Sequence, residues 1–116
     1  AYNDSQGVTA KFNLNVLRRL NRELDADFPV AAFRHRAWFN PEHSRIEMHL
    51  EATRAVTVHL GGESFPFAAG ETIHTENSYR YSIPDFEKLL DASGFTPCAR
   101  WTDSRGWFGV FYAEAR

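Results

Sequence analysis

The spacing of apolar residues changes part-way along this chain, and that change limits the folds open to it. Residues Ser5–Leu24 place apolar side chains three and four positions apart, which predicts an amphipathic helix capped by Asp4 or Ser5. The same period predicts a second helix over Val30–Trp38. From Ile46 onward the spacing falls to two, which is typical of strands with one buried face. The chain is therefore expected to begin with helices and to continue as a sheet.

Four extended segments follow the change of spacing. Ile46–Glu51 and Val56–Leu60 alternate apolar with polar residues, and we expect the loop Ala52–Ala55 to join them as an antiparallel hairpin. Ser64–Phe67 is expected at a sheet edge, because its proline cannot donate a hydrogen bond to a neighbouring strand. Thr72–Tyr79 is a further extended segment. Together these segments predict a mainly antiparallel sheet.

The last third of the chain predicts one more helix and a strand pair. Residues 82–85 (SIPD) combine an N-cap serine, a proline in the first turn and an acid at the capping-box position. Gly94 is a suitable residue for the end of this helix. Pro97–Trp101 and Trp107–Ala113 predict two strands joined by a turn. The predicted class is α+β, with two or three helices and a mainly antiparallel sheet.

Length and composition exclude several classes of function. The 116 residues suffice for one domain, but not for the several βα units of a complete nucleotide-binding domain. The net charge of −2 argues against nucleic-acid binding, and no apolar run approaches the roughly 18 residues of a membrane span. The polar N-terminus shows no secretory leader. The single cysteine, Cys98, fits a small buried side chain and a reducing compartment. We therefore expect a cytoplasmic protein with no membrane or nucleic-acid partner.

Three asparagines in the first predicted helix leave two interpretations open. Asn13, Asn15 and Asn21 are mediocre helix formers, so their presence suggests that some of them have polar partners. The alternative is that all three face solvent, where asparagine is most often found.

The histidines of the expected hairpin also allow two interpretations. His49 and His59 would lie side by side on its polar face, where Glu47 or Glu51 could complete a metal site. The alternative is a pair of surface histidines, because the spacing matches no established metal-binding motif. No metal ligand is assigned on this evidence.

One extended segment carries an unusual combination of polar groups. In a regular strand His74, Glu76 and Ser78 would share one face. A carboxylate beside a hydroxyl forms an acceptor site for an N–H donor such as an imidazole or an amine. An ordinary strand end with a solvated glutamate is the other interpretation.

Several short motifs, in order and similarly spaced, resemble the C-terminal part of the histidine-specific methyltransferases. These enzymes use S-adenosylmethionine to convert histidine to hercynine in ergothioneine biosynthesis. The resemblance covers essentially the whole chain. The matching motifs are AYND at residues 1–4, GVTA at 7–10, FN at 12–13, NREL at 21–24, RIEM at 45–48, AAGE at 68–71, TENS at 75–78 and WTD at 101–103.

The resemblance implies a division of the chain and a set of substrate contacts. Residues 1–82 would form the second part of the histidine-binding domain, and residues 83–116 the last helix and strand pair of a Rossmann-like methyltransferase domain. In the family, the residues matching Glu76 and Ser78 bind the imidazole of L-histidine. The residue matching Tyr2 holds the substrate carboxylate, and the one matching Met48 lines the imidazole pocket.

The resemblance also implies what the chain lacks. The loop that binds S-adenosylmethionine would lie in the absent N-terminal part of the family sequence, so no catalytic or cofactor-binding residue is assigned here. We therefore expect a substrate-binding portion that does not catalyse methylation alone. Detached apolar surface would favour a homo-oligomer. The alternative is a free-standing small α+β binding or oligomerisation domain without enzymatic activity.

Overall fold

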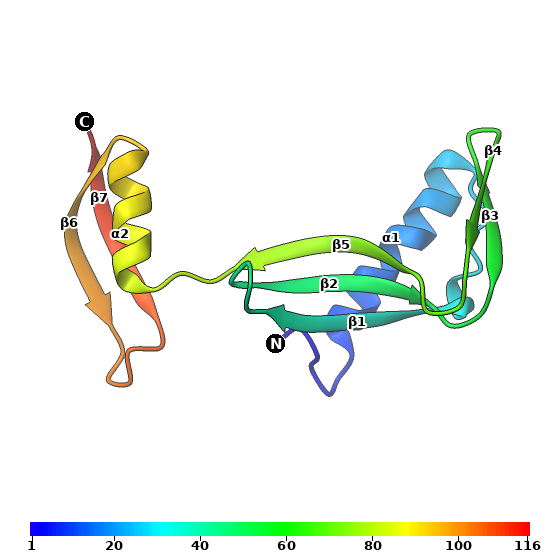
Figure 1. Ribbon diagram of the computed structural model, residues 1–116, viewed down its shortest axis with the longest axis horizontal. Helices are drawn as coiled ribbons and strands as arrows, with labels where there is room; N and C mark the ends of the chain where they lie inside the picture. Colours follow the sequence, from blue (N-terminus) through cyan, green and yellow to red (C-terminus); the bar gives the residue numbers. More distant parts are fainter. The chain divides into compact units, whose positions relative to one another are not determined.

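Antiparallel strand pairs and two α-helices make up the chain, in a computed structural model that describes all of residues 1–116 (Figure 1). This confirms the expected α+β class. The elements follow in the order α1 (Val8–Leu24), a 3₁₀ turn (Val30–Ala32), β1 (Phe33–Asn40), β2 (Arg45–Ala52), β3 (Val56–Leu60), β4 (Glu63–Phe67), β5 (Thr72–Tyr79), α2 (Ile83–Ala92), β6 (Phe95–Thr102) and β7 (Gly109–Ala115).

The chain divides into two compact units between Tyr79 and Arg80, three residues before the boundary expected at residue 82. We call Ala1–Tyr79 the N-terminal unit and Arg80–Arg116 the C-terminal unit. Neither helix is long and apolar enough to cross a membrane.

The N-terminal unit is built on a three-stranded antiparallel sheet in the order β1-β2-β5, with β2 in the centre. Helix α1 packs against β1 and β2, and β3 and β4 form a separate hairpin (Figure 1). The core lies where these parts meet, and its buried members are Leu17, Ala32, Phe33, Leu50, Ala52 and Val56. Burial of this apolar surface is the main stabilising contribution to the unit.

Helix α1 begins at Val8, three residues later than the start expected at Ser5. Gly7 occupies the N-cap position with a φ of 70°, and it has no side chain that could cap the helix. The Asp4 carboxylate takes over this role by accepting the backbone N–H groups of Val8 and Thr9, at 2.9 and 3.0 Å. These bonds, that of Thr9 first, lower the pKa of Asp4 below its usual value.

The helix expected over Val30–Trp38 is wrong, because most of this segment is strand β1. Its apolar residues fit both periods: Val30, Phe33 and Ala37 are spaced as in a helix, whereas Phe33, Ala37 and Phe39 fall on one face of a strand. Pairing with the whole of β2 decides between the two, since it satisfies the backbone hydrogen bonds of the segment.

The hairpin expected between β2 and β3 is also wrong. Strand β2 pairs with β1 and β5, and β3 pairs only with β4. The β3–β4 turn does use Gly61 and Gly62, at φ angles of 61° and 78°, which suits the tight hairpin turn expected there. Strand β5 has the bounds that the sequence predicts.

The C-terminal unit consists of α2 and the β6–β7 hairpin. Ser82 caps α2 as expected, by accepting the backbone N–H of Asp85. The strands are displaced from the expected bounds, because the Asp103 carboxylate accepts the N–H groups of Trp107 and Phe108, at 2.7 and 2.9 Å, and holds both residues in the turn. Cys98 is exposed, so the expectation of a buried cysteine is wrong.

Candidate functional site

The pairing of β2 with β5 places three of the four expected substrate-binding residues on one sheet face. Met48 lies opposite Glu76, and Ile46 lies opposite Ser78. Directly opposed residues of an antiparallel pair point to the same side. Met48 is buried at 2% exposure, whereas Glu76 is exposed. This face, which we call the α1 face, is the side of the sheet that helix α1 covers.

Tyr2 reaches the same place from the start of the chain. Its Oη donates a hydrogen bond to Ser78 Oγ at 2.8 Å. Its backbone carbonyl accepts a bond of 2.7 Å from His35 Nε2, and the next residue, Asn3, donates from Nδ2 to the Ala37 carbonyl at 2.9 Å. The N-terminal segment is therefore fastened along β1, and all four expected residues come together through register and hydrogen bonds.

A buried asparagine connects α1 to this arrangement. Asn13 is 1% exposed, and its Nδ2 donates to His35 Nδ1 at 2.9 Å and to the His49 carbonyl at 3.1 Å. Its Oδ1 accepts from Thr75 Oγ1 at 2.7 Å. The His49 carbonyl can only accept a hydrogen bond, so the group that faces it must be the NH₂ of Asn13. The same NH₂ group faces His35 Nδ1, which is therefore an acceptor. His35 Nε2 then carries the proton that is donated to Tyr2.

Two of the three asparagines of α1 thus have polar partners, as one of the open interpretations required. Asn21 Oδ1 accepts the Phe28 N–H at 2.7 Å, and its Nδ2 donates to the Phe28 carbonyl at 2.9 Å. Asn15 is exposed. Sequence reasoning did not single out Asn13 or His35 as site residues, although the unusual asparagine content of the helix was the available signal.

His74 does not share a face with Glu76 and Ser78, so that expectation is wrong. The register of β5 against β2 shifts between Met48, which opposes Glu76, and His49, which opposes His74. Thr75 is the extra residue of this β-bulge, and such a bulge reverses the alternation of side chains. Thr75 Oγ1 bonds Asn13, so the bulge itself is anchored to α1.

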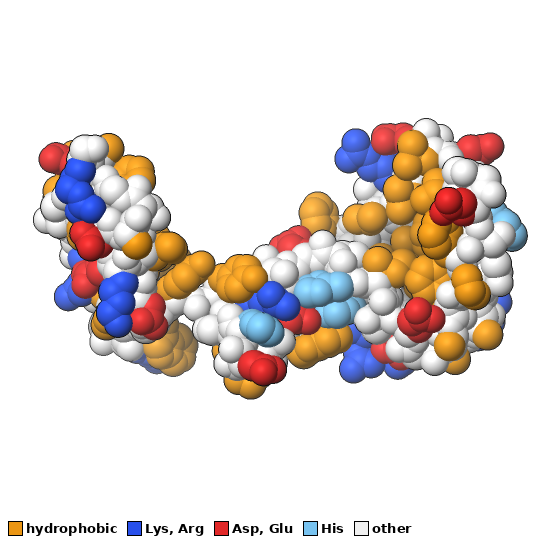
Figure 2. All heavy atoms as spheres, turned by 45° about the horizontal axis from the view of Figure 1, so that its top comes forward, with side chains coloured by type: hydrophobic (Ala, Val, Ile, Leu, Met, Phe, Trp, Pro, Cys, Tyr) orange, Lys and Arg blue, Asp and Glu red, His pale blue; other side chains and the backbone are white.

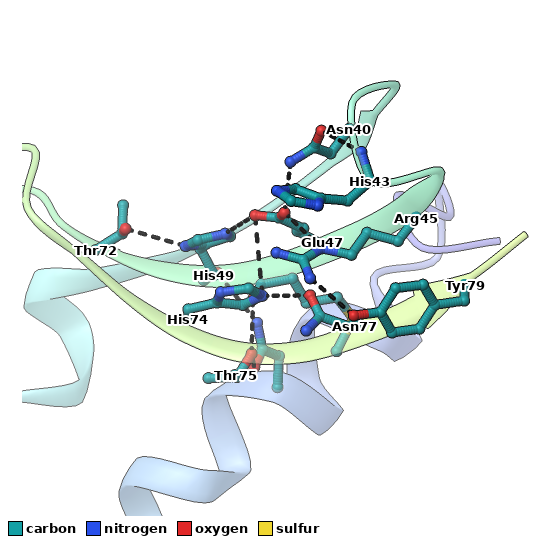
Figure 3. Close-up of polar contacts among 12 residues, drawn as sticks. Asn40, His43, Arg45, Glu47, His49, Thr72, His74, Thr75, Asn77 and Tyr79 are labelled. Carbon is teal, nitrogen blue, oxygen red and sulfur yellow. Dashed lines mark hydrogen bonds and ion pairs between the residues drawn. The ribbon is translucent and has the colours of Figure 1, made fainter.

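The opposite sheet face carries a dense polar cluster, shown in Figure 3. Glu47 is 6% exposed, and its Oε2 accepts from Asn40 Nδ2 at 2.8 Å and from Arg45 Nε at 2.9 Å. Its Oε1 lies 3.0 Å from His49 Nε2 and 3.9 Å from His74 Nε2. Hydrogen bonds from His49 first, then Asn40 and Arg45, lower the pKa of Glu47 to about 2.

Aromatic rings stack across this face. Trp38, His49 and His74 come from β1, β2 and β5, and their centroids are 4.1 and 4.3 Å apart with interplanar angles of 16°. Figure 2 shows histidine, arginine and acidic side chains gathered together on the surface of the N-terminal unit. We call Glu47, His49 and His74 the histidine cluster; their potential ligand atoms lie within 4.8 Å of one another.

His49 and His59 do not lie side by side, as one of the two interpretations required, because β2 and β3 are not neighbours. His59 instead contacts Asp27, whose Oδ2 lies 2.7 Å from its Nδ1 and whose Oδ1 accepts its backbone N–H at 2.5 Å. That backbone bond is the main cause of a lowered pKa at Asp27. The partner that joins His49 and Glu47 is His74.

A shallow hollow of about 240 Å³ lies beside Tyr2. It is lined by residues 1–3, by Ala37, Trp38 and Phe39 of β1, and by Ile46 of β2. Of the four expected substrate-binding residues, the lining of this hollow includes only Tyr2.

Comparison with known proteins identifies the family of this chain. A family model described as histidine-specific, SAM-dependent methyltransferase matches residues 1–115. The chain belongs to this family.

Individual relatives agree with the family assignment. The chain is 43% identical to the histidine N-alpha-methyltransferase of Mycolicibacterium smegmatis and 44% identical to that of Mycobacterium tuberculosis, in each case over 97% of this chain and 36% of the relative. It is 26% identical to the N-methyltransferase imqF of Aspergillus flavus, over 94% of this chain and 30% of the relative. The chain thus spans about a third of the length of the curated relatives it matches.

Proposed function

We propose that the protein containing this chain trimethylates the α-amino group of L-histidine to hercynine, and that this chain is its C-terminal, substrate-binding portion. The observation that supports the proposal is the grouping of Met48, Glu76 and Ser78 on the α1 face, with Tyr2 bonded to Ser78. Assignment of residues 1–82 to the histidine-binding domain and of residues 83–116 to the methyltransferase domain belongs to the same proposal.

Imidazole is a good match for these side chains. A neutral imidazole carries one N–H donor and one acceptor nitrogen. The exposed Glu76 carboxylate accepts the N–H, and the Ser78 hydroxyl binds the other nitrogen. The buried Met48 provides an adaptable apolar wall for the ring. Side chains that cannot pair with both polar groups are rejected, because they leave a desolvated carboxylate or hydroxyl without its hydrogen bond.

The network behind the pocket sets the position of Tyr2. Asn13 makes His35 Nδ1 an acceptor, His35 Nε2 binds the Tyr2 carbonyl, and the Tyr2 hydroxyl binds Ser78. Tyr2 is thereby held next to the imidazole-binding residues, and when substrate binds, its hydroxyl can turn from Ser78 to donate its one hydrogen bond to the substrate carboxylate. Such positioning supplies a large part of the rate of a bimolecular transfer.

The methyl donor belongs to a part of the family sequence outside this chain. S-adenosylmethionine, when bound, supplies an electrophilic methyl group. No residue of this chain is assigned to it, because the sequence contains no GxGxxG motif. The role of this chain is to hold the imidazole and the carboxylate of histidine, so that the neutral α-amino group is positioned for attack.

Histidine binding provides the test. We expect L-histidine, but not L-tryptophan, to shift the amide resonances of β2 and β5 in the isotope-labelled chain. Glu76→Gln should weaken binding by at least about tenfold, the effect of losing one charge-assisted hydrogen bond. Glu63→Gln on β4 is the matched control and should leave affinity unchanged. Equal binding of both amino acids, or an unaltered affinity in Glu76→Gln, contradicts the proposed pocket.

Activity provides a second test. The isolated chain should give no methyl transfer from labelled S-adenosylmethionine to histidine, whereas the full-length protein should. Turnover by the chain alone would show that the donor site lies within it.

Cytoplasmic location and self-association are further parts of the proposal. Trp107 and Phe108 are 79% and 70% exposed, and apolar surface of this kind favours association. Light scattering of the chain at tens of micromolar should report a dimer or larger species, and a monomeric mass would refute self-association.

A further inference from the structure

The histidine cluster has the donor atoms of a metal site, on the sheet face that the proposed histidine pocket does not use. We propose that Glu47, His49 and His74 bind a divalent transition-metal ion of the Zn²⁺ class. One carboxylate oxygen and two imidazole nitrogens lie within 4.8 Å of one another. Two histidines and a glutamate form a donor set found in zinc sites.

Two of the three ligands are already held in place by neighbouring groups. Glu47 and His49 are 6% and 7% exposed. Asn40 and Arg45 occupy Glu47 Oε2, which leaves Oε1 turned toward both imidazoles (Figure 3). His49 Nδ1 lies 3.0 Å from the Thr72 hydroxyl, which can accept its proton and so free Nε2 as a ligand. Hydrogen bonds of this kind orient the ligands in metal sites.

The third ligand must move to complete the site. His74 Nε2 is 3.9 Å from Glu47 Oε1, and its ring is nearly parallel to that of His49, so the two nitrogen lone pairs do not converge on one point. The His74 side chain is 36% exposed, which leaves it room to rotate. The Asn77 Oδ1, 2.6 Å from His74 Nε2, is an additional oxygen donor at the same position. Metal binding therefore breaks the stack of the two imidazoles.

The net charge of the histidine cluster and its neighbours determines which kind of metal ion it favours. Arg45 compensates the single carboxylate of the cluster, so little net negative charge remains to hold Ca²⁺ or Mg²⁺, which need several oxygen ligands. Imidazole ligands instead favour Zn²⁺, Ni²⁺ and Cu²⁺. Glu47 and His49 belong to β2 and His74 belongs to β5, so a bound ion links these strands beside the bulge.

Zinc titration tests the proposal. With the whole chain in competition with a chromophoric chelator at pH 7.5, we expect one site per chain. His74→Ala should weaken Zn²⁺ binding by at least about tenfold, because loss of even a residue that only orients a metal ligand costs about 10–100-fold. His59→Ala is the matched control, because it removes a histidine that also contacts a carboxylate but lies on β3; it should bind Zn²⁺ as the unmodified chain does.

Imidazole NMR provides an independent readout of the ligand atoms. One equivalent of Zn²⁺ should shift the Nε2 resonances of His49 and His74, leave those of His59 in place, and raise the unfolding temperature of the chain. Circular dichroism should show that His74→Ala is folded, because the side chain is partly exposed. Absence of a one-to-one site, or equal Zn²⁺ affinity in His74→Ala and the unmodified chain, overturns the proposal. Neither outcome bears on histidine binding.

Discussion

Replacement of Asn13 by alanine should strongly destabilise the N-terminal unit. The side chain is 1% exposed and makes three hydrogen bonds, which join α1 to all three strands of the sheet. In the variant, the Thr75 hydroxyl keeps an acceptor, because it lies 3.1 Å from the Met48 carbonyl. The His49 carbonyl and His35 Nδ1 lose the donor that Asn13 provided.

The expected loss follows from these contacts. Each of the two acceptors that lose the Asn13 donor costs about 1–3 kcal/mol. Alanine is a better helix former than asparagine by about 0.6 kcal/mol, which offsets a small part of the loss. The net destabilisation should be about 3 kcal/mol. In a domain of about 60–100 residues this lowers Tm by on the order of 15 °C.

Thermal unfolding followed by the amide resonances of β1, β2 and β5 measures this loss separately from the C-terminal unit. Asn15→Ala is the matched control, since Asn15 lies on the same helix and is exposed; its stability should change by less than about 0.5 kcal/mol. If Asn13→Ala differs from Asn15→Ala by less than about 1 kcal/mol, the buried network does not stabilise the unit as argued.

Two further predictions concern stability. The pKa of Glu47, lowered from 4.5 to about 2 mainly by the hydrogen bond from His49, gives a stabilisation that is present above about pH 4.5 and lost as the pH falls toward 2. Urea unfolding across this range should show the loss in the unmodified chain and in Glu42→Gln, and much less of it in Glu47→Gln; a parallel acid response in Glu47→Gln would refute the assignment. Ser82→Ala should cost the C-terminal unit about 1 kcal/mol by removing the cap of α2, whereas Ser104→Ala in the β6–β7 turn should cost less than about 0.5 kcal/mol; equal unfolding midpoints would refute the capping role.

Structural features could be predicted from the sequence where a few neighbouring residues determine them. The cap at Ser82 and the bounds of β5 follow from capping chemistry and from alternation, and the structure has both. Val30–Trp38 fits either period, so only its pairing with β2 decides that it is mostly strand. The partners of a strand depend on contacts distant in sequence, which is why the hairpin joined by Ala52–Ala55 was wrong.

The candidate site was also predictable only in part. The family resemblance brought together Tyr2, Met48, Glu76 and Ser78, and the structure places them on one face or in direct contact. The position of His74 could not be predicted, because a strand without its partner shows no sign of a bulge. Polar partners of a buried residue such as Asn13 are equally hidden, since they lie on strands far along the chain.

The bulge at Thr75 explains how one strand can contribute residues to both proposed sites. In a regular strand His74 and Glu76 would point the same way, and a shift of one residue would turn every later side chain to the other face. The bulge keeps Glu76 and Ser78 on the α1 face, beside Met48 and Tyr2, while it turns His74 toward Glu47. Thr75 is fixed to Asn13, so α1 stabilises the register on which both sites depend. A change that releases this residue from α1 should therefore disturb histidine binding and metal binding together, although the two sites lie on opposite faces.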